Sequence, residues 1–162
     1  MLAQLNATDW GALARAVHIL AVVVWIGGVW LVTTALLPAM RGKPPADWLR
    51  EFEALEHRFA PQARIAVLLV LLSGLYMLDR YDLWGRFGRS GYWWMDLMVG
   101  VWVVFTVMLF VIEPFVFRRV VRKRAMRAPE ATLARMLWLH RILLTLALLA
   151  VFAAGGGAHG LF

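Results

Sequence analysis

The residues of this chain best suited to chemistry are its four histidines, His18, His57, His140 and His159. His18 stands in the apolar run "RAVHILAVVVWIGGVWLVTTALLPAM", which has the character of a segment that crosses a lipid bilayer. An imidazole in hydrocarbon costs free energy unless it has a partner. A metal ion is one such partner, because a neutral imidazole nitrogen donates its lone pair to it. The chain has no cysteine, which excludes thiolate metal sites, iron–sulfur clusters and haem attached through Cys-x-x-Cys-His.

The histidines divide by their expected depth into an outer pair, His18 and His159, and an inner pair, His57 and His140. Two imidazoles from facing helices suit b-type haem, whose iron takes two axial ligands, and helix bundles build such sites between their helices. The sequence therefore predicts one or two haem b groups, the outer held by His18 and His159 and the inner by His57 and His140. On an unbroken helix His140 and His159 lie ~28 Å apart, so they cannot serve one haem.

Basic residues stand near the predicted inner histidines. Arg64 and Arg141 are candidate partners for haem propionates, and either could instead pair with Glu113, a carboxylate near the inner end of an apolar segment. Intramembrane carboxylates commonly mark proton or ion paths. The alternatives without a cofactor are a histidine that hydrogen-bonds a neighbouring helix and an arginine that extends to the membrane surface.

A second metal chemistry is also open at the outer end. Met95 and Met98 flank Asp96, and together with His18 or His159 they could form a copper site, since thioether and imidazole ligands suit Cu(I). The alternative for the two methionines is packing between helices. Nucleophile–base pairs, phosphate-binding loops and dinucleotide fingerprints are not evident, so an enzyme of the soluble type is not indicated.

The elements that must position these residues are membrane spans. The 162 residues are 62% hydrophobic with a mean hydropathy of +0.71, whereas soluble domains are about 45–50% apolar. Most of the long apolar segments approach the ~20 residues that cross a bilayer. We expect a single all-α transmembrane domain over residues 1–162, an integral membrane four-helix bundle whose spans are Val17–Leu37, Ile65–Leu78, Trp93–Phe117 and Leu137–Ala154.

One segment ahead of the second span has a different pattern. In "ADWLREFEALEHRFA", Trp48, Phe52, Leu55 and Phe59 recur at helical spacing between charged residues. This pattern predicts a short amphipathic helix before the second span, either on the inner membrane surface or as a cytoplasmic extension of that span.

The distribution of cations predicts the orientation. Residues 41–64 hold five of the 17 lysines and arginines and residues 118–141 hold eight, against four on the other side. The positive-inside rule therefore places both termini outside, N-out/C-out, in a bacterial-type inner (plasma) membrane. The net charge of +7 is then explained by topology, and we expect no nucleic acid as a partner. Tryptophans at the ends of the spans are expected at the two membrane interfaces: Trp10, Trp84, Trp93 and Trp94 outside, Trp48 and Trp138 inside.

The first span also carries a family resemblance. In "AVHILAVVVWIGGVWLV" a histidine precedes Trp25 by seven residues, and Gly27 and Gly28 follow, which resembles span one of the HemJ-type protoporphyrinogen IX oxidases and of the CopD-type copper-resistance membrane proteins. The stretches "EHRFAPQARIAVLLVLLSGLYML" and "GYWWMDLMVGVWVVF" resemble their second and third spans. The resemblance implies a four-helix membrane fold and, on the HemJ side, haem b with His18 as ligand.

Two differences between this chain and those families distinguish between the functions that the resemblance implies. These families commonly carry a lysine where this chain has Asp96, and the HemJ type commonly has an arginine soon after the small residues of span one, where "VWLVTTALLPAM" has none. The expected function is therefore electron transfer by a haem b membrane protein. Its expected partners are quinol or quinone and a redox partner protein, and an oligomer is one possible form of assembly. Copper transport or resistance of the CopD type and a HemJ-like oxidase are the alternatives, so whether the chain is an enzyme stays open.

Overall fold

The computed structural model describes residues 7–161, and every regular element in this part of the chain is a helix. The first helical rod consists of α1 (Ala7–Leu31), the π-helical η2 (Val32–Leu36) and α2 (Leu37–Ala39). The 36-residue α3 (Pro45–Arg80) follows, and two single 3-10 turns, η3 (Trp84–Arg86) and η4 (Ser90–Tyr92), lead into the second half. The remaining elements are α4 (Trp93–Val107), the π-helical η5 (Met108–Val121), α5 (Arg122–Arg127) and α6 (Pro129–Ala158).

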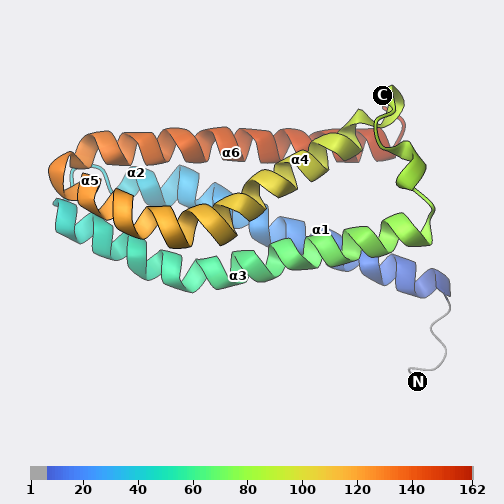
Figure 1. The fold of residues 1–162 in the computed structure, drawn as a ribbon, viewed down its shortest axis with the longest axis horizontal. Coiled ribbons are helices and arrows are strands. Elements are labelled where there is room, and N and C mark those ends of the chain that lie inside the picture. Colours follow the sequence, from blue (N-terminus) through green and yellow to red (C-terminus); the bar gives the residue numbers. More distant parts are fainter. Residues whose placement is uncertain (1–6, 162) are drawn as a thin grey trace, which may run out of the picture.

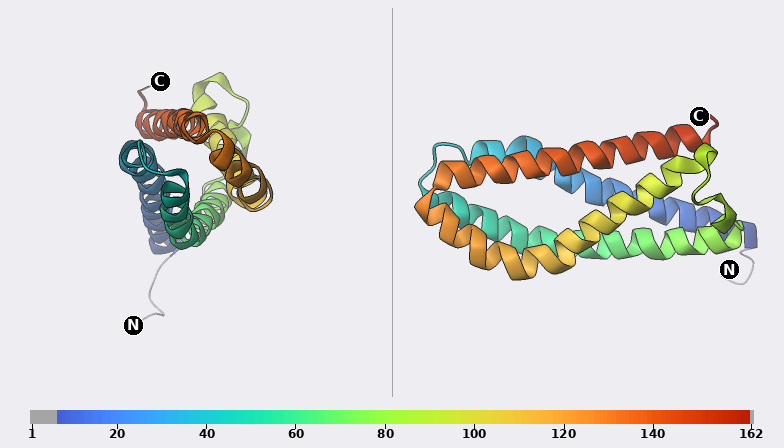
Figure 2. Two further views of the ribbon diagram at one scale, coloured as in Figure 1. Left: turned by 90° about the vertical axis from the view of Figure 1, so that its left-hand side faces the viewer. Right: turned by 45° about the horizontal axis from the view of Figure 1, so that its top comes forward.

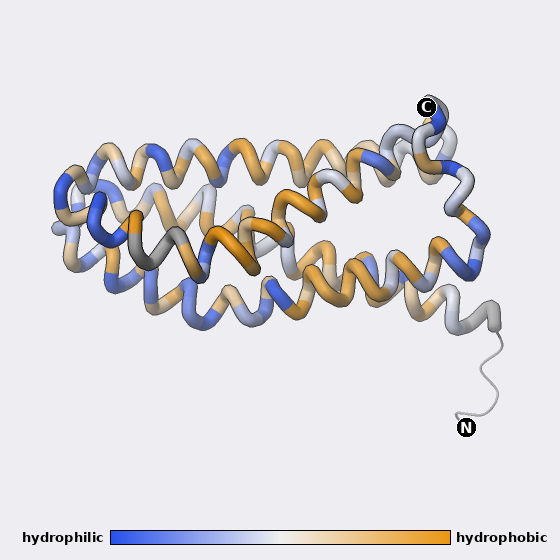
Figure 3. The backbone as a smooth tube through the Cα atoms, viewed as in Figure 1, coloured by the Kyte–Doolittle hydropathy of each residue, from blue (hydrophilic) through white to orange (hydrophobic). Residues whose placement is uncertain are grey.

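Four stretches are long and apolar enough to cross a membrane: Trp10–Ala39, Pro45–Arg80, Ser90–Phe115 and Pro129–Ala158. Each contains or overlaps one predicted span and extends beyond it at one end or both. Figure 3 shows apolar residues along the middle of the helices and hydrophilic ones where α3 begins and around α5. We call this the basic end of the molecule. Figure 1 shows the start of α1, the end of α6 and the segment 81–92 together at the opposite end, which we call the terminal end.

The segment before the second span is not a separate helix. Residues 46–60 belong to α3 and continue without a break through Pro61, so of the two sequence alternatives the extension of the span is the one observed. Its apolar face is buried in the protein, because Trp48 and Phe52 pack with Leu37 of α2 and Leu137 of α6. The prediction that Trp48 lies at the membrane interface was wrong: its side chain is only 1% exposed, since α2, α5 and α6 cover it.

The other tryptophans predicted at the membrane interfaces are exposed, with one exception. Trp10, Trp84, Trp93 and Trp138 are exposed, as interfacial residues would be. Trp94 is buried, which contradicts its predicted interfacial position. It packs against α6 at Gly157, where a Cβ would overlap the indole ring, and this missing side chain is what admits Trp94 to the interior.

The helices associate in two pairs. The most extensive contact in the molecule joins α1 to α3, and the next joins α4 to α6. Figures 1 and 2 show the two pairs converging in the middle of the molecule and separating toward the terminal end. A central cluster joins all four long helices, with Trp25 of α1, Val67 of α3, Phe105 of α4 and Ala147 of α6 among its buried residues. Trp25 meets Phe105 edge-to-face at a centroid distance of 4.9 Å.

The outer surface of the long helices is apolar. Large side chains such as Leu20, Leu72 and Phe152 are each more than 60% exposed. A soluble monomer rarely exposes apolar area on this scale, and in a helix whose backbone hydrogen bonds are all internal it is the surface that faces lipid. The exposed surface and the four long helices together indicate a multi-pass membrane protein.

Candidate functional site

The side chain of His18 points from α1 toward α3. Its Nδ1 lies 2.9 Å from Oγ of Ser73. The serine hydroxyl has one proton, which it donates to the carbonyl of Leu69 one turn earlier in α3. The serine oxygen is therefore the acceptor and Nδ1 of His18 is the donor. In the neutral imidazole this assignment puts the lone pair on Nε2, the nitrogen to which a metal would bind.

Small residues allow α1 to approach α3 closely enough for this contact. A Cβ on Gly74 would lie 3.5 Å from Cε1 of His18, so the imidazole rests against the α3 backbone. A Cβ on Gly28 would overlap the ring of Phe59, and one on Gly11 would overlap the hydroxyl of Tyr81. A small residue on one helix that accepts a large one from the other is typical of packing between membrane helices.

His140 and His159 are held by their own helix in a comparable way. Nδ1 of the half-buried His140 lies 2.9 Å from the Met136 carbonyl, and Nδ1 of the exposed His159 lies 2.8 Å from the Gly155 carbonyl. A carbonyl only accepts hydrogen bonds, so Nδ1 is the donor in both residues, and in the neutral imidazole the lone pair is on Nε2. Histidines that bind metals almost always donate their other N–H to a carbonyl or carboxylate in this way.

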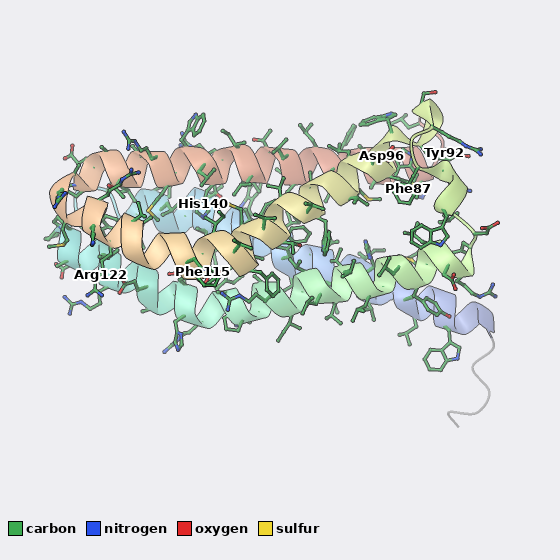
Figure 4. The ribbon with its side chains drawn as sticks, viewed as in Figure 1. Phe87, Tyr92, Asp96, Phe115, Arg122 and His140 are labelled. Carbon is green, nitrogen blue, oxygen red and sulfur yellow. The ribbon has the colours of Figure 1, made fainter. Side chains whose placement is uncertain are left out.

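The two predicted histidine pairs are not joined by any hydrogen bond within residues 7–161. His57 is exposed on α3 and lines a cavity that His140 does not line. His18 packs on α3, whereas His159 follows α6, and at the terminal end these two helices lie apart in Figures 1 and 2. Figure 4 labels His140 on α6, away from that separated end. The outer and inner pairings stay predictions.

An ion pair crosses from α3 to η5. Nη2 of Arg64 lies 3.0 Å from Oε1 of Glu113, and Nε of Arg64 donates to the Leu109 carbonyl at 3.2 Å. Of the partners considered for Arg64, Glu113 is the one observed. Arg141 is exposed on α6, and within the described residues no ion pair involves it. Its predicted role as a propionate partner stays a prediction.

The residues of the copper alternative have other contacts. Both oxygens of Asp96 accept the N–H of Gly88, at 3.2 and 3.4 Å. Gly88 has a φ of +70°, which glycine adopts without strain, so Asp96 secures the turn that leads into α4. Met95 is buried with Trp94 and Ala153. Within residues 7–161 no group of three or more histidines, aspartates or glutamates is arranged to hold a metal ion.

Sequence reasoning missed Ser73. A usable signal exists in the sequence: the chain has only two serines, and Ser73 is the one inside a predicted span, next to Gly74. The chain matches no protein-family model, and comparisons with curated proteins and with solved structures find no match. The site therefore has to be interpreted from its own geometry.

Proposed function

We propose that this protein is a b-type haem-binding integral membrane protein that transfers electrons, with His18 as an axial ligand of the haem iron. The observation that carries the proposal is the Nδ1 hydrogen bond of His18 to Ser73, which orients the ring and, in the neutral imidazole, puts the lone pair on Nε2.

The residues at this position fit a haem. A macrocycle supplies four iron ligands of its own, so a single well-oriented imidazole on each side completes the coordination. Gly74 allows the imidazole to lie against α3, and the side chains on the outer surface of the spans are apolar, as the environment of a porphyrin ring must be. When bound, the haem supplies a one-electron couple. Ser73 keeps the imidazole in one tautomer, and the apolar spans keep water from the ring nitrogens.

The wider arrangement that we propose is an N-out/C-out four-helix bundle in a bacterial inner membrane. His159 is the proposed second axial ligand, because its Nδ1 also donates to a carbonyl and leaves Nε2 as the nitrogen that would bind iron. A second haem held by His57 and His140, with Arg64 and Arg141 near its propionates, is the two-haem form of the same proposal. A quinol or quinone and a redox partner protein would exchange electrons with it. Copper binding is less favoured, because Asp96 and Met95 have other contacts.

Haem content of the purified protein tests the proposal. The chain is expressed with haem supply, purified in detergent and analysed by its absorption spectrum and by pyridine haemochrome per chain. We expect a Soret band that is lost in His18→Ala if only the outer haem is bound, halved if the inner haem is bound as well, and retained in Thr106→Ala, whose hydroxyl bonds to a carbonyl of its own helix, α4. Loss of half the haem in His57→Ala and in His140→Ala would identify the inner site. A colourless wild type after haem supply, or full haem content in His18→Ala, refutes the proposal.

A further inference from the structure

A proline interrupts the backbone hydrogen bonds of the helix that leads to the basic end. The π-helical η5 contains Pro114, and in a π-helix each N–H donates to the carbonyl five residues earlier. Proline has no N–H, so the carbonyl of Leu109 lacks its donor within the helix. Helices commonly bend at prolines, and Figure 2 shows the rod of α4, η5 and α5 changing direction between α4 and α5.

The missing donor comes from another helix. Nε of Arg64 in α3 donates to this same Leu109 carbonyl at 3.2 Å, and Nη2 of Arg64 donates to Oε1 of Glu113 at 3.0 Å. The guanidinium also lies over the ring of Phe110, 6.0 Å from its centre. All three contacts fall in the turn directly before Pro114. Because a backbone carbonyl without a donor is costly in an apolar region, Arg64 both satisfies the interrupted turn and binds it to α3.

Beyond this turn the chain has few buried contacts until α6 begins. We call residues 115–127 the strap. Of the strap residues whose side chains the structure describes, only Ala125 is buried, whereas Phe115 and Met126 are each more than 60% exposed. The strap ends at Ala128, whose non-helical backbone separates α5 from α6. A segment with so few buried contacts between two breaks in the helix can open locally at a small cost in free energy.

The strap forms part of the wall of a cavity of about 500 Å³ toward the basic end. Arg122 of the strap and Glu113 line one side of this cavity, and Pro61 and Arg64 are among the residues of α3 that line the other. Figure 4 labels Phe115 and Arg122 on the strap, beside α3. Movement of the strap away from α3 would therefore widen the cavity.

We propose that the strap is a gate on this cavity, with hinges at Pro114 and Ala128, and that Arg64 is the latch that keeps it closed. In the closed state Arg64 binds the Leu109 carbonyl and the Glu113 carboxylate. When Arg64 releases both groups, the turn before Pro114 loses these bonds to α3 and the strap moves outward. The gate does not rest on the haem proposal, because every group that it uses belongs to the chain itself.

Distances between spin labels test the latch. The chain has no cysteine, so Ala54→Cys on α3 and Lys123→Cys on the strap, both at exposed positions, give one labelled pair for pulsed electron paramagnetic resonance in nanodiscs without added haem. In Arg64→Gln the population with a longer distance should rise about 10- to 150-fold, as expected for the loss of a hydrogen bond to a charged group. Arg58→Gln, at an exposed position of α3, should keep the wild-type distribution. An unchanged distribution in Arg64→Gln overturns the proposal.

A second substitution tests the hinge. Pro114→Ala restores an N–H that can bond the Leu109 carbonyl within the helix, so the turn no longer needs a donor from α3. In the double variant Arg64→Gln, Pro114→Ala the longer distance should therefore be lost. If the longer distance persists in the double variant, the break at Pro114 is not the hinge and the gate as proposed is overturned.

A second labelled pair distinguishes a gate from a loosened bundle. Ala54→Cys on α3 and Ala134→Cys at an exposed position of α6 should give the same distance in every variant. Equal broadening of this pair and of the strap pair would overturn the proposal. If Arg64→Gln does not fold, Glu113→Ala takes its place, because it removes the ion pair and keeps the bond to Leu109. The longer distance should then appear to a smaller extent, and its absence would overturn the latch.

Discussion

Ser73→Ala is the most direct test of how His18 is held. The substitution removes the acceptor of the His18 Nδ1 proton and changes little else, because the serine hydroxyl otherwise bonds only within its own helix. Iron at Nε2 requires the proton on Nδ1, so the haem-bound state has a buried donor without an acceptor, which costs about 1–3 kcal/mol, whereas the haem-free imidazole can turn or change its tautomer. At about 1.4 kcal/mol per factor of ten, haem affinity should fall about 5- to 140-fold. Partners that orient metal ligands in other proteins contribute about 10–100-fold, which agrees with this range.

The assay is a haemin titration of haem-free protein in nanodiscs, followed at the Soret band. Ser73→Thr keeps a hydroxyl at the same position and should restore most of the affinity. Thr106→Ala is the matched control, since it removes a span hydroxyl that bonds only to the carbonyl of Trp102. If Ser73→Ala binds haemin as tightly as the wild type while His18→Ala does not bind it, the serine does not position the ligand. Equal weakening by Thr106→Ala would show a general effect on the helices instead.

The remaining predictions concern packing, the loop and orientation. Gly28→Leu should lower the free energy of unfolding by about 1–3 kcal/mol, because the new side chain overlaps Phe59. Gly27→Leu is the control, since its side chain meets open space and should change this free energy little. The two variants are compared by thermal unfolding in detergent. Asp96→Ala should speed amide exchange at Gly88, read by hydrogen–deuterium exchange, and unchanged protection there would contradict the contact. The orientation can be tested with single cysteines, because the chain has none of its own. In intact cells, a cysteine in the loop between α3 and α4 should react with an impermeant maleimide, and one in the loop between α2 and α3 should not. The reverse pattern would show that the orientation is opposite to the one proposed.

Much of the fold could be predicted from the sequence because its dominant signal is local. A run of about 20 apolar residues has few alternatives to a spanning helix, so the four long helices were found. Most of their ends were placed too far inward, since a helix such as α3 continues through charged residues such as Glu53 and Arg58 beyond its apolar run. The burial of Trp48 and Trp94 could not be predicted. Burial depends on which helix lies opposite, and an isolated tryptophan near the end of a span favours the interface.

Some residues of the candidate site could also be predicted from a local signal in the sequence. His18 and Glu113 are conspicuous because a polar side chain in an apolar run is rare. The partners were harder to find: Ser73 is 55 residues from His18, and Arg64 is 49 residues from Glu113. Several residues offered comparable chemistry, and Arg141 was as plausible a partner for Glu113 as Arg64. Only the packing of η5 against α3 distinguishes them.

The pairing of α1 with α3 and of α4 with α6 has a consequence for biogenesis. Each pair is a helical hairpin closed at the basic end, and the segment 81–92 is the only covalent link between the hairpins. A hairpin whose two helices bury their shared contact surface can enter the bilayer as a unit during synthesis. The first hairpin can therefore insert before the second has been made. The polypeptide should therefore tolerate a break in the link, so that two separately translated halves find each other in the membrane. The indole N–H of Trp102 in the second half donates to the Val67 carbonyl in the first half, so this hydrogen bond would form only when the two halves associate correctly.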